Sequence, residues 1–154
     1  MSNSATIAAL EAELKRMEGP LGEPDSMTIE YGAVRRMALA LENFDPIHYE
    51  KDAAKAAGYR GVVAPWPLLW LLFFNCREGP LQFSFGKATI HGQDSYEFHE
   101  PMIVGDLITV TAEVGETSIK QGRSGVMGVV VSRRVFHNQH GNLCAVMQTT
   151  NLRR

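Results

Sequence analysis

Hydrophobic positions in the first part of the chain recur at the spacing of an α-helix. Ser4 can cap a helix that runs to about Arg16, and the Gly19–Pro20 pair ends it. The apolar face of this helix consists of Ile7, Leu10, Leu14 and Met17. We expect it to be either a docking helix or a frayed end of the chain.

Three more helices are predicted before the middle of the chain. Thr28 is placed to cap the second helix, and residues 51–57 form a short third helix that Gly58 ends. Pro67 suits the first position of the fourth helix. Because residues 68–74 are apolar on every side, we expect this fourth helix to be buried on most of its surface.

The second half of the chain changes to the alternating period of β-strands. The predicted strands cover residues 94–100, 106–117, 124–136 and 142–151. Turn signals separate them at intervals that suit antiparallel hairpins, whereas residues 20–25 are predicted to be an irregular connector. The pattern therefore indicates an α+β fold with a buried helix beside an antiparallel sheet.

Composition narrows the range of functions. A chain of 154 residues favours one domain with one core. The formal net charge of −2, without a long basic run, makes a nucleic-acid partner improbable. The longest apolar run, residues 68–74, is too short to span a bilayer, and the first residues lack the pattern of a secretory signal. We expect a cytoplasmic protein with no membrane partner.

Cysteine and motif content argue against metal and nucleotide chemistry. Cys76 and Cys144 lie far apart without a CxxC spacing, which predicts two buried, reduced thiols rather than a zinc site. The histidines show no metal-ligand spacing, and no GxSxG motif or phosphate-binding loop occurs. We therefore expect no metal and no cofactor.

Two neighbouring segments, residues 43–50 and 58–68, carry groups suited to chemistry on a carbonyl compound. The first sets Asn43, Asp45 and His48 on a sharp turn, where a side chain can act on a substrate. The second leads into a buried helix, whose first N–H groups can receive a developing negative charge. The alternative is structural, since Asn and Asp commonly stabilise turns and a histidine can be satisfied within the core.

The spacing of residues 43–50 resembles the MaoC-like hydratases and dehydratases of the hotdog-fold superfamily. In that family the turn carries an aspartate and then x-Asn-Pro-x-His, and the aspartate and histidine together activate one water. His48 and Pro46 match the pattern. Asp45, however, stands where the family usually has asparagine, and Asn43 stands where it usually has the catalytic aspartate.

This exchange leaves three alternatives for the catalytic residues. A carboxylate can take a proton from water, whereas a neutral amide can only orient the water by hydrogen bonding. His48 could be the sole base beside Asn43, Asp45 could substitute from a shifted turn, or the site could be impaired. Asn–His pairs also occur in relatives that resemble the mesaconyl-CoA hydratases.

The segment before the buried helix departs from the family pattern as well. Many relatives have Val-His-Gly-x-Leu there, with the glycine N–H donating to the thioester carbonyl, whereas this chain has Ala64, Pro65 and Trp66. That version resembles the FAS1-like dehydratase branch, which includes paired dehydratase subunits. The resemblance implies that Val63, Ala64, Trp66 and Trp70 bind substrate and that Trp66 supplies the N–H. Helix initiation and core packing are the structural alternatives.

The resemblance covers residues 28–152 and implies a hotdog fold, in which a curled antiparallel sheet wraps around a long buried central helix. It includes residues 98–106, which resemble the family's F-x-x-P-V-x-x-G-D turn and are interpreted as architectural. We expect an N-terminal helical arm over residues 1–20 and a single hotdog domain over residues 21–154.

By the same resemblance, we expect a lyase that hydrates 2-enoyl-CoA or dehydrates 3-hydroxyacyl thioesters. Its substrate partner would be an acyl-CoA or acyl-carrier thioester. Its protein partner would be a second MaoC-like chain, in a homodimer or heterodimer, because pairing covers an exposed sheet edge. One alternative is a non-catalytic subunit that shapes the acyl pocket of a catalytic partner. A thioesterase is the weakest alternative, because no acidic residue lies between Trp66 and Cys76.

Overall fold

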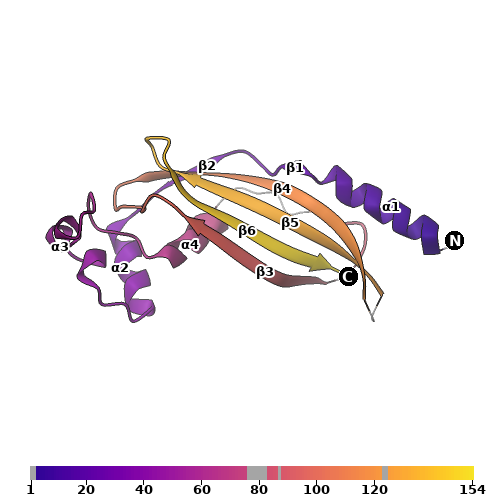
Figure 1. The fold of residues 1–154 in the computed structure, drawn as a ribbon, viewed down its shortest axis with the longest axis horizontal. Coiled ribbons are helices and arrows are strands. Elements are labelled where there is room, and N and C mark those ends of the chain that lie inside the picture. The colour runs from indigo at the N-terminus through magenta and orange to yellow at the C-terminus, as the bar shows by residue number, and fades with distance from the viewer. Residues whose placement is uncertain (1–2, 76–82, 87, 123–124) are drawn as a thin grey trace.

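An antiparallel sheet is the largest element of the computed structural model, which describes residues 3–75, 83–86, 88–122 and 125–154. Its strands are β1 (Gly19–Pro20), β2 (Asp25–Thr28), β3 (Thr89–Phe98), β4 (Leu107–Gly122), β5 (Gly125–His137) and β6 (Leu143–Arg153). They lie in the order β1-β4-β5-β6-β3, and β2 also pairs with β4 (Figure 1). β3 is therefore an edge strand.

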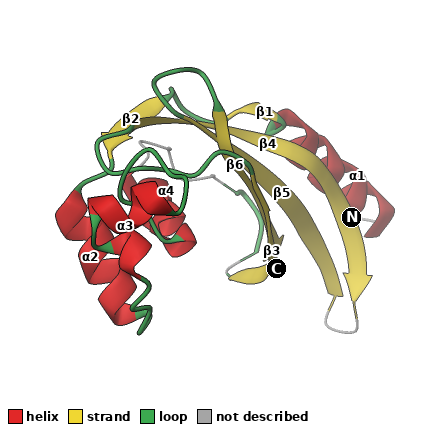
Figure 2. Cartoon of the chain, turned by 60° about the vertical axis from the view of Figure 1, so that its left-hand side comes forward, coloured by secondary structure: helices red, strands yellow, loops and turns green. Residues whose placement is uncertain are grey.

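The helices gather at two ends of this sheet. They are α1 (Asn3–Arg16), α2 (Tyr31–Ala40), α3 (Lys51–Ala56) and α4 (Leu69–Asn75), with short 3₁₀ turns η1 (Pro46–His48) and η2 (Trp66–Leu68). Figure 2 shows the sheet curled, with α2, α3 and α4 on its concave side, whereas α1 lies toward the other end of the sheet. The prediction of an α+β fold with a curled antiparallel sheet is confirmed.

The central helix is shorter than expected in the described part of the chain. α4 covers seven residues after η2, so the predicted long helix is not established by the residues that the structure describes. Leu68, Leu69 and Leu72 are buried, whereas Leu71 is 40% exposed. Among residues 68–72, whose burial the structure describes, one side is therefore buried and Leu71 is exposed, although the sequence is apolar all round.

The core forms where α4 and α2 meet the sheet. Its fully buried side chains include Val34, Leu69, Ile108, Phe136 and Met147. On β5 the even-numbered residues 128–136 are all buried, which is the period expected for a strand with one covered face. Burial of this face explains the alternating pattern of β5, whereas no residue of the edge strand β3 is buried.

Two predicted helix caps were wrong. α1 already begins at Asn3, so Ser4 lies inside the helix instead of capping it. Thr28 belongs to β2 and pairs with Leu107 of β4, and α2 begins only at Tyr31. Pairing with β4 holds Thr28 in an extended conformation, so tertiary structure overrides the local capping signal. The same pairing turns part of the predicted irregular connector into β1 and β2.

α1 is a docking helix in this structure. Leu14 is 1% exposed and packs against β4 and β5. Just after the helix, Glu18 accepts hydrogen bonds from the Lys15 ammonium at 2.8 Å and from the N–H and hydroxyl of Thr117 at 2.9 and 2.8 Å. These bonds lower the pKa of Glu18 to about 2, with Lys15 as the largest cause. The division into an arm and a hotdog domain remains a prediction.

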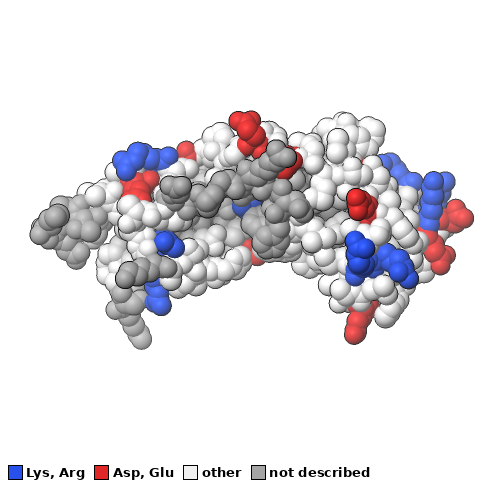
Figure 3. Space-filling view, turned by 180° about the vertical axis from the view of Figure 1, so that it is seen from behind, with Lys and Arg blue, Asp and Glu red and all other residues white. Residues whose placement is uncertain are grey.

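Charged side chains of both signs are mixed on the surface of the molecule. On the face shown in Figure 3, Lys and Arg lie among Asp and Glu near the two ends, and further Asp or Glu side chains lie along the upper middle of the view. Within the described ranges, no helix has the length and hydropathy needed to cross a membrane.

Cys144 is a buried free thiol, and burial raises its pKa. Cys76 lies outside the described residues.

Candidate active site

Side-chain oxygens shape the turn between α2 and α3. The Asn43 Oδ1 accepts a hydrogen bond from the Asp45 N–H at 3.1 Å, and the Asp45 Oδ1 accepts one from the Ile47 N–H at 3.1 Å. The second bond caps η1, and Asp45 has the extended ψ of 123° that a residue before proline prefers. Asn43 and Asp45 therefore both stabilise the turn, as the structural interpretation of these residues predicted.

His48 ends η1 and is buried, with 7% of its surface exposed. Its Nδ1 lies 2.7 Å from the backbone oxygen of Val63. Because a carbonyl oxygen can only accept, Nδ1 of the neutral ring carries the proton and Nε2 keeps its lone pair. The hydrogen bond therefore fixes the tautomer of the imidazole ring and leaves Nε2 unprotonated and able to accept a proton.

Backbone pairing fixes the position of the Val63 carbonyl. The Val63 N–H donates to the Ile47 oxygen at 3.0 Å, so the two segments predicted to carry the chemistry lie side by side. Val63 also forms an isolated antiparallel bridge with Ile103, and the Ala64 N–H donates to the Met102 oxygen at 2.9 Å. The side chains of Val63 and Ala64 are buried, so only backbone groups of these two residues are available to the candidate site.

The segment that follows turns into η2 at Trp66. Pro65 occupies the N-cap position with an extended ψ of 140°. As the first residue of η2, Trp66 has an N–H without an acceptor inside the helix. Only Pro65 separates it from Ala64, whose own N–H is bonded to Met102. The structure thus places the Trp66 N–H three residues after the carbonyl that holds His48.

Comparisons with known proteins assign the chain to a family. The profile described as "FAS1-like, dehydratase domain region" matches residues 18–147, which is most of the chain. The chain belongs to this family. The resemblance to MaoC-like hydratases and dehydratases is thereby confirmed.

Sequence relatives of this FAS1-like chain are distant. A "UPF0336 protein" of Mycolicibacterium paratuberculosis is 28% identical over 137 residues, which cover 82% of this chain and 80% of the relative. The "UPF0336 protein" of Mycobacterium leprae is 25% identical over 133 residues, with the same coverage of both chains. Their names state no activity.

Solved structures show that the FAS1-like chain has the hotdog fold. A chain of the ChsH1-ChsH2 complex from Mycobacterium tuberculosis superposes with a TM-score of 0.78 at 17% identity, over 96% of this chain and 92% of that chain. A chain of the HadBC (3R-hydroxyacyl-ACP dehydratase) complex from the same organism gives 0.67 at 22% identity, with coverages of 87% and 95%. The (R)-hydratase from A. caviae gives 0.60 at 22% identity, with 85% and 94%. At these identities the likeness establishes the fold alone.

The FAS1-like chain also carries two aromatic side chains on β3 that the sequence did not assign to the site: Phe98 was interpreted as architectural, and Tyr96 was not singled out. The Trp66 ring lies 5.5 Å from Tyr96 and 6.0 Å from Phe98, and Tyr96 stacks on Phe98 at 6.1 Å. We call Trp66, Tyr96 and Phe98 the aromatic triad. Trp66 and Phe98 are more than half exposed. The signal that could have found the β3 members is their alternation, since positions two apart on a strand share a face.

Trp70 continues this line of aromatic residues along α4. It is half-buried, donates a hydrogen bond to the Tyr96 hydroxyl and lies 6.5 Å from the His91 ring. His91 Nε2 lies 3.0 Å from Asp94 Oδ2. Burial raises the pKa of Tyr96, and the negative charge of Asp94 raises it further.

In the described parts of the chain, no three His, Cys, Asp or Glu side chains form a set that could hold a metal ion.

Proposed function

We propose that this chain adds water across the double bond of a 2-enoyl thioester, or removes it in the reverse direction, with His48 as the base. The observation that supports this most directly is the 2.7 Å contact between His48 Nδ1 and the Val63 oxygen. It gives Nε2 the lone pair that proton abstraction from water requires. Membership in a dehydratase family supports the same class of reaction.

The proposed mechanism uses three groups of this chain. His48 Nε2 takes a proton from water, while the Asn43 amide orients that water by hydrogen bonding. The oxygen bonds to C3 of the enoyl group, and the electrons of the double bond move into the thioester carbonyl. The Trp66 N–H stabilises the resulting enolate oxygen. Protonated His48 then returns the proton to C2, so the reaction is redox-neutral and requires no metal or redox cofactor.

Replacing Asn43 with Asp tests the role of the turn. The carboxylate is nearly the same shape as the amide and can still accept from the Asp45 N–H, so the turn should persist. A second group able to take a proton should raise the hydration rate about tenfold, which is less than the ~10²- to 10⁴-fold contribution of a general base, because His48 already takes that role. Stopped-flow loss of enoyl absorbance from crotonyl-CoA measures this rate.

The matched variant Asp45→Asn separates the alternatives. Its amide oxygen can still accept from the Ile47 N–H, so only the charge changes. Loss of hydration in this variant would assign the base to Asp45 instead of to His48 with Asn43. An Asn43→Asp chain no faster than the wild type would contradict the assignment of Asn43 to the reacting water.

A non-catalytic subunit is the second candidate. The observation that favours it is that the side-chain oxygens of Asn43 and Asp45 both accept backbone hydrogen bonds within the turn. In that case the chain would shape the acyl pocket of a MaoC-like partner. The purified chain alone, tested on crotonyl-CoA and on a bulkier 2-enoyl-CoA, decides between the candidates. No turnover on either substrate, with the chain folded, would favour the non-catalytic subunit.

We also propose that β3 pairs with a second MaoC-like chain, identical or related. β3 is an edge strand whose backbone groups can extend the sheet, and its Phe98 side chain is 54% exposed. Two of the structural neighbours are chains of complexes, ChsH1-ChsH2 and HadBC. Continuing the sheet across the pair would cover this edge and part of the aromatic triad.

Light scattering on the purified chain tests this pairing. We expect a mass about twice the 17.0 kDa of one chain for the wild type, and a monomer for Phe98→Glu, because the charge would be buried at the interface. The control Phe44→Glu, at a residue 69% exposed and outside β3, should remain dimeric. A monomeric wild type at high concentration would contradict self-pairing and leave the related chain as the partner to test.

A further inference from the structure

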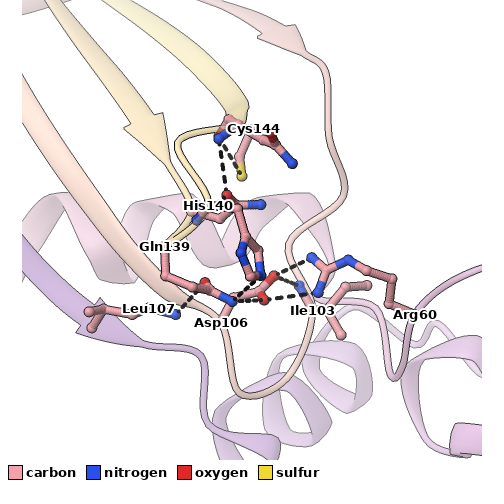
Figure 4. Close-up of polar contacts among 9 residues, drawn as sticks. Arg60, Ile103, Asp106, Leu107, Gln139, His140 and Cys144 are labelled. Atoms are coloured by element: carbon pink, nitrogen blue, oxygen red, sulfur yellow. Dashed lines mark hydrogen bonds and ion pairs between the residues drawn. The ribbon is translucent and has the colours of Figure 1, made fainter.

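Asp106 is a buried carboxylate that joins segments far apart in the sequence (Figure 4). The Arg60 guanidinium donates to both of its oxygens, at 3.2 and 3.0 Å. The Gln139 side-chain amide donates to Oδ1 at 3.1 Å, and the Ile103 N–H donates to Oδ2 at 2.9 Å. A carboxylate with four such bonds is held in one orientation.

The charge of Asp106 is stabilised in spite of its burial. Burial acts to raise the pKa of this carboxyl, but the hydrogen bonds from Arg60, Gln139 and the Ile103 N–H outweigh it and lower the pKa below its usual range. The side chain of Asp106 is 3% exposed, whereas that of Arg60 is 46% exposed. Arg60 is therefore the member of this pair that can be changed with less risk to the core.

The bonds of Asp106 lead directly to the segment that holds His48. Asp106 accepts a hydrogen bond from the Ile103 N–H, and Ile103 pairs with Val63 in an antiparallel bridge. Around this bridge, two further backbone bonds of 2.9 Å tie residues 62–64 to residues 102–104, one from Val104 to Val62 and one from Ala64 to Met102. Asp106 thus anchors the strand-like pairing that sets the position of the Val63 carbonyl.

Arg60 anchors the same segment from its other end. It lies three residues before Val63, and its guanidinium is fixed on Asp106. Between them, Gly61 packs so closely that a Cβ there would lie 3.0 Å from the Ile103 side chain. The ion pair of Arg60 and the backbone bridge of Val63 therefore hold the two ends of the closely packed residues 60–63.

We propose that Asp106 and Arg60 are positioning residues, which hold the Val63 carbonyl where it fixes the tautomer of His48. The consequence for catalysis rests on the proposed function of His48. If the carbonyl moves, the neutral ring can place its proton on Nε2, and that nitrogen then has no lone pair for water. Neither residue needs to touch the substrate to control the base.

Two arginine variants with matched exposure test this proposal. Arg60→Met breaks the ion pair to Asp106, whereas the control Arg133→Met breaks an ion pair to Glu113. The side chain of Arg60 is 46% exposed and that of Arg133 is 40% exposed. Glu113 and Arg133 are paired residues of β4 and β5, outside residues 62–64. Both changes remove one partly exposed positive charge and one ion pair. They differ in the link to Val63 and in the carboxylate left behind, since the side chain of Asp106 is 3% exposed and that of Glu113 is 50% exposed.

Nitrogen-15 NMR of the His48 ring gives a readout that is independent of turnover. At about pH 8.5, above the ordinary titration range of histidine, we expect the Nδ1–H tautomer in the wild type and in Arg133→Met. Arg60→Met should show a second population with the proton on Nε2. Identical ring spectra in the two arginine variants would overturn the proposal, whether or not the wild type is an active hydratase.

Kinetics then connect the tautomer to the reaction. We expect kcat for crotonyl-CoA to fall about tenfold in Arg60→Met with little change in KM, since displacement of a catalytic group by a fraction of an ångström reduces turnover. Arg60→Lys, which can keep one bond to Asp106, should recover part of the loss. Asp106→Asn should show the same tautomer change as Arg60→Met. An unchanged kcat in an active wild-type background would also overturn the proposal.

Discussion

Replacing His48 with Ala should reduce kcat/KM for hydration of crotonyl-CoA by about 10²- to 10⁴-fold, which is the usual contribution of a positioned general base. The imidazole has its Nδ1 committed to the Val63 carbonyl, so Nε2 has the lone pair needed to take a proton from water. Neither turn residue offers a full substitute, because Asn43 is neutral and the Asp45 carboxylate already caps η1. Loss of enoyl absorbance at saturating and limiting substrate gives both kcat and KM.

The control for this experiment is His137→Ala. His137 ends β5 and pairs with Thr109 and Leu143, outside the turn of residues 43–50. It should keep wild-type kinetics. Because His48 is buried, circular dichroism and thermal unfolding must show that the Ala variant is folded. A folded His48→Ala chain with wild-type turnover would contradict the proposed mechanism.

Replacing Phe136 with Ala should lower the free energy of unfolding by about 3–5 kcal/mol, the range for removing a large aromatic side chain from a core. Phe136 is fully buried, and it lies on β5 between Val110 of β4 and Ala145 of β6. Its ring belongs to the cluster that contains Leu69 of α4. The cavity would therefore open between the sheet and α4, the helix that follows the candidate site.

Urea denaturation followed by circular dichroism measures this loss. Phe44→Ala is the matched control, because the same side chain is removed from a site that is 69% exposed. We expect its effect to stay within about 0.5 kcal/mol. Equal destabilisation by the two changes would mean that the contact between α4 and the sheet is not the main core of the domain.

The sequence predicted the elements whose signals are local. Alternation and turn signals predicted the four long strands; on β5 the alternation follows the burial of one face, whereas no residue of the edge strand β3 is buried. The caps at Ser4 and Thr28 failed for different reasons. The first differs from the observed start of α1 by a few residues, whereas Thr28 is extended because β2 pairs with β4, a partner that lies far along the chain.

The candidate site divides in the same way. Asn43, Asp45 and His48 could be predicted because they lie within one turn of the chain. The hydrogen-bond acceptor of His48 could not be predicted, since the sequence does not indicate which backbone carbonyl of residues 58–68 lies next to the ring. The positions of Tyr96 and Phe98 against Trp66 likewise depend on how β3 lies beside η2, which no local pattern determines.

The prolines on either side of Trp66 make its amide a natural reporter of ligand binding. The structure describes residues 64–68 without a gap, and Pro65 and Pro67 have no N–H at all. The N–H groups of Ala64 and Leu68 are already bonded to Met102 and Pro65. The Trp66 amide therefore remains as the one N–H in this stretch for the carbonyl oxygen of the proposed thioester substrate. In a proton–nitrogen correlation spectrum, a single resonance would follow the carbonyl of a bound acyl group.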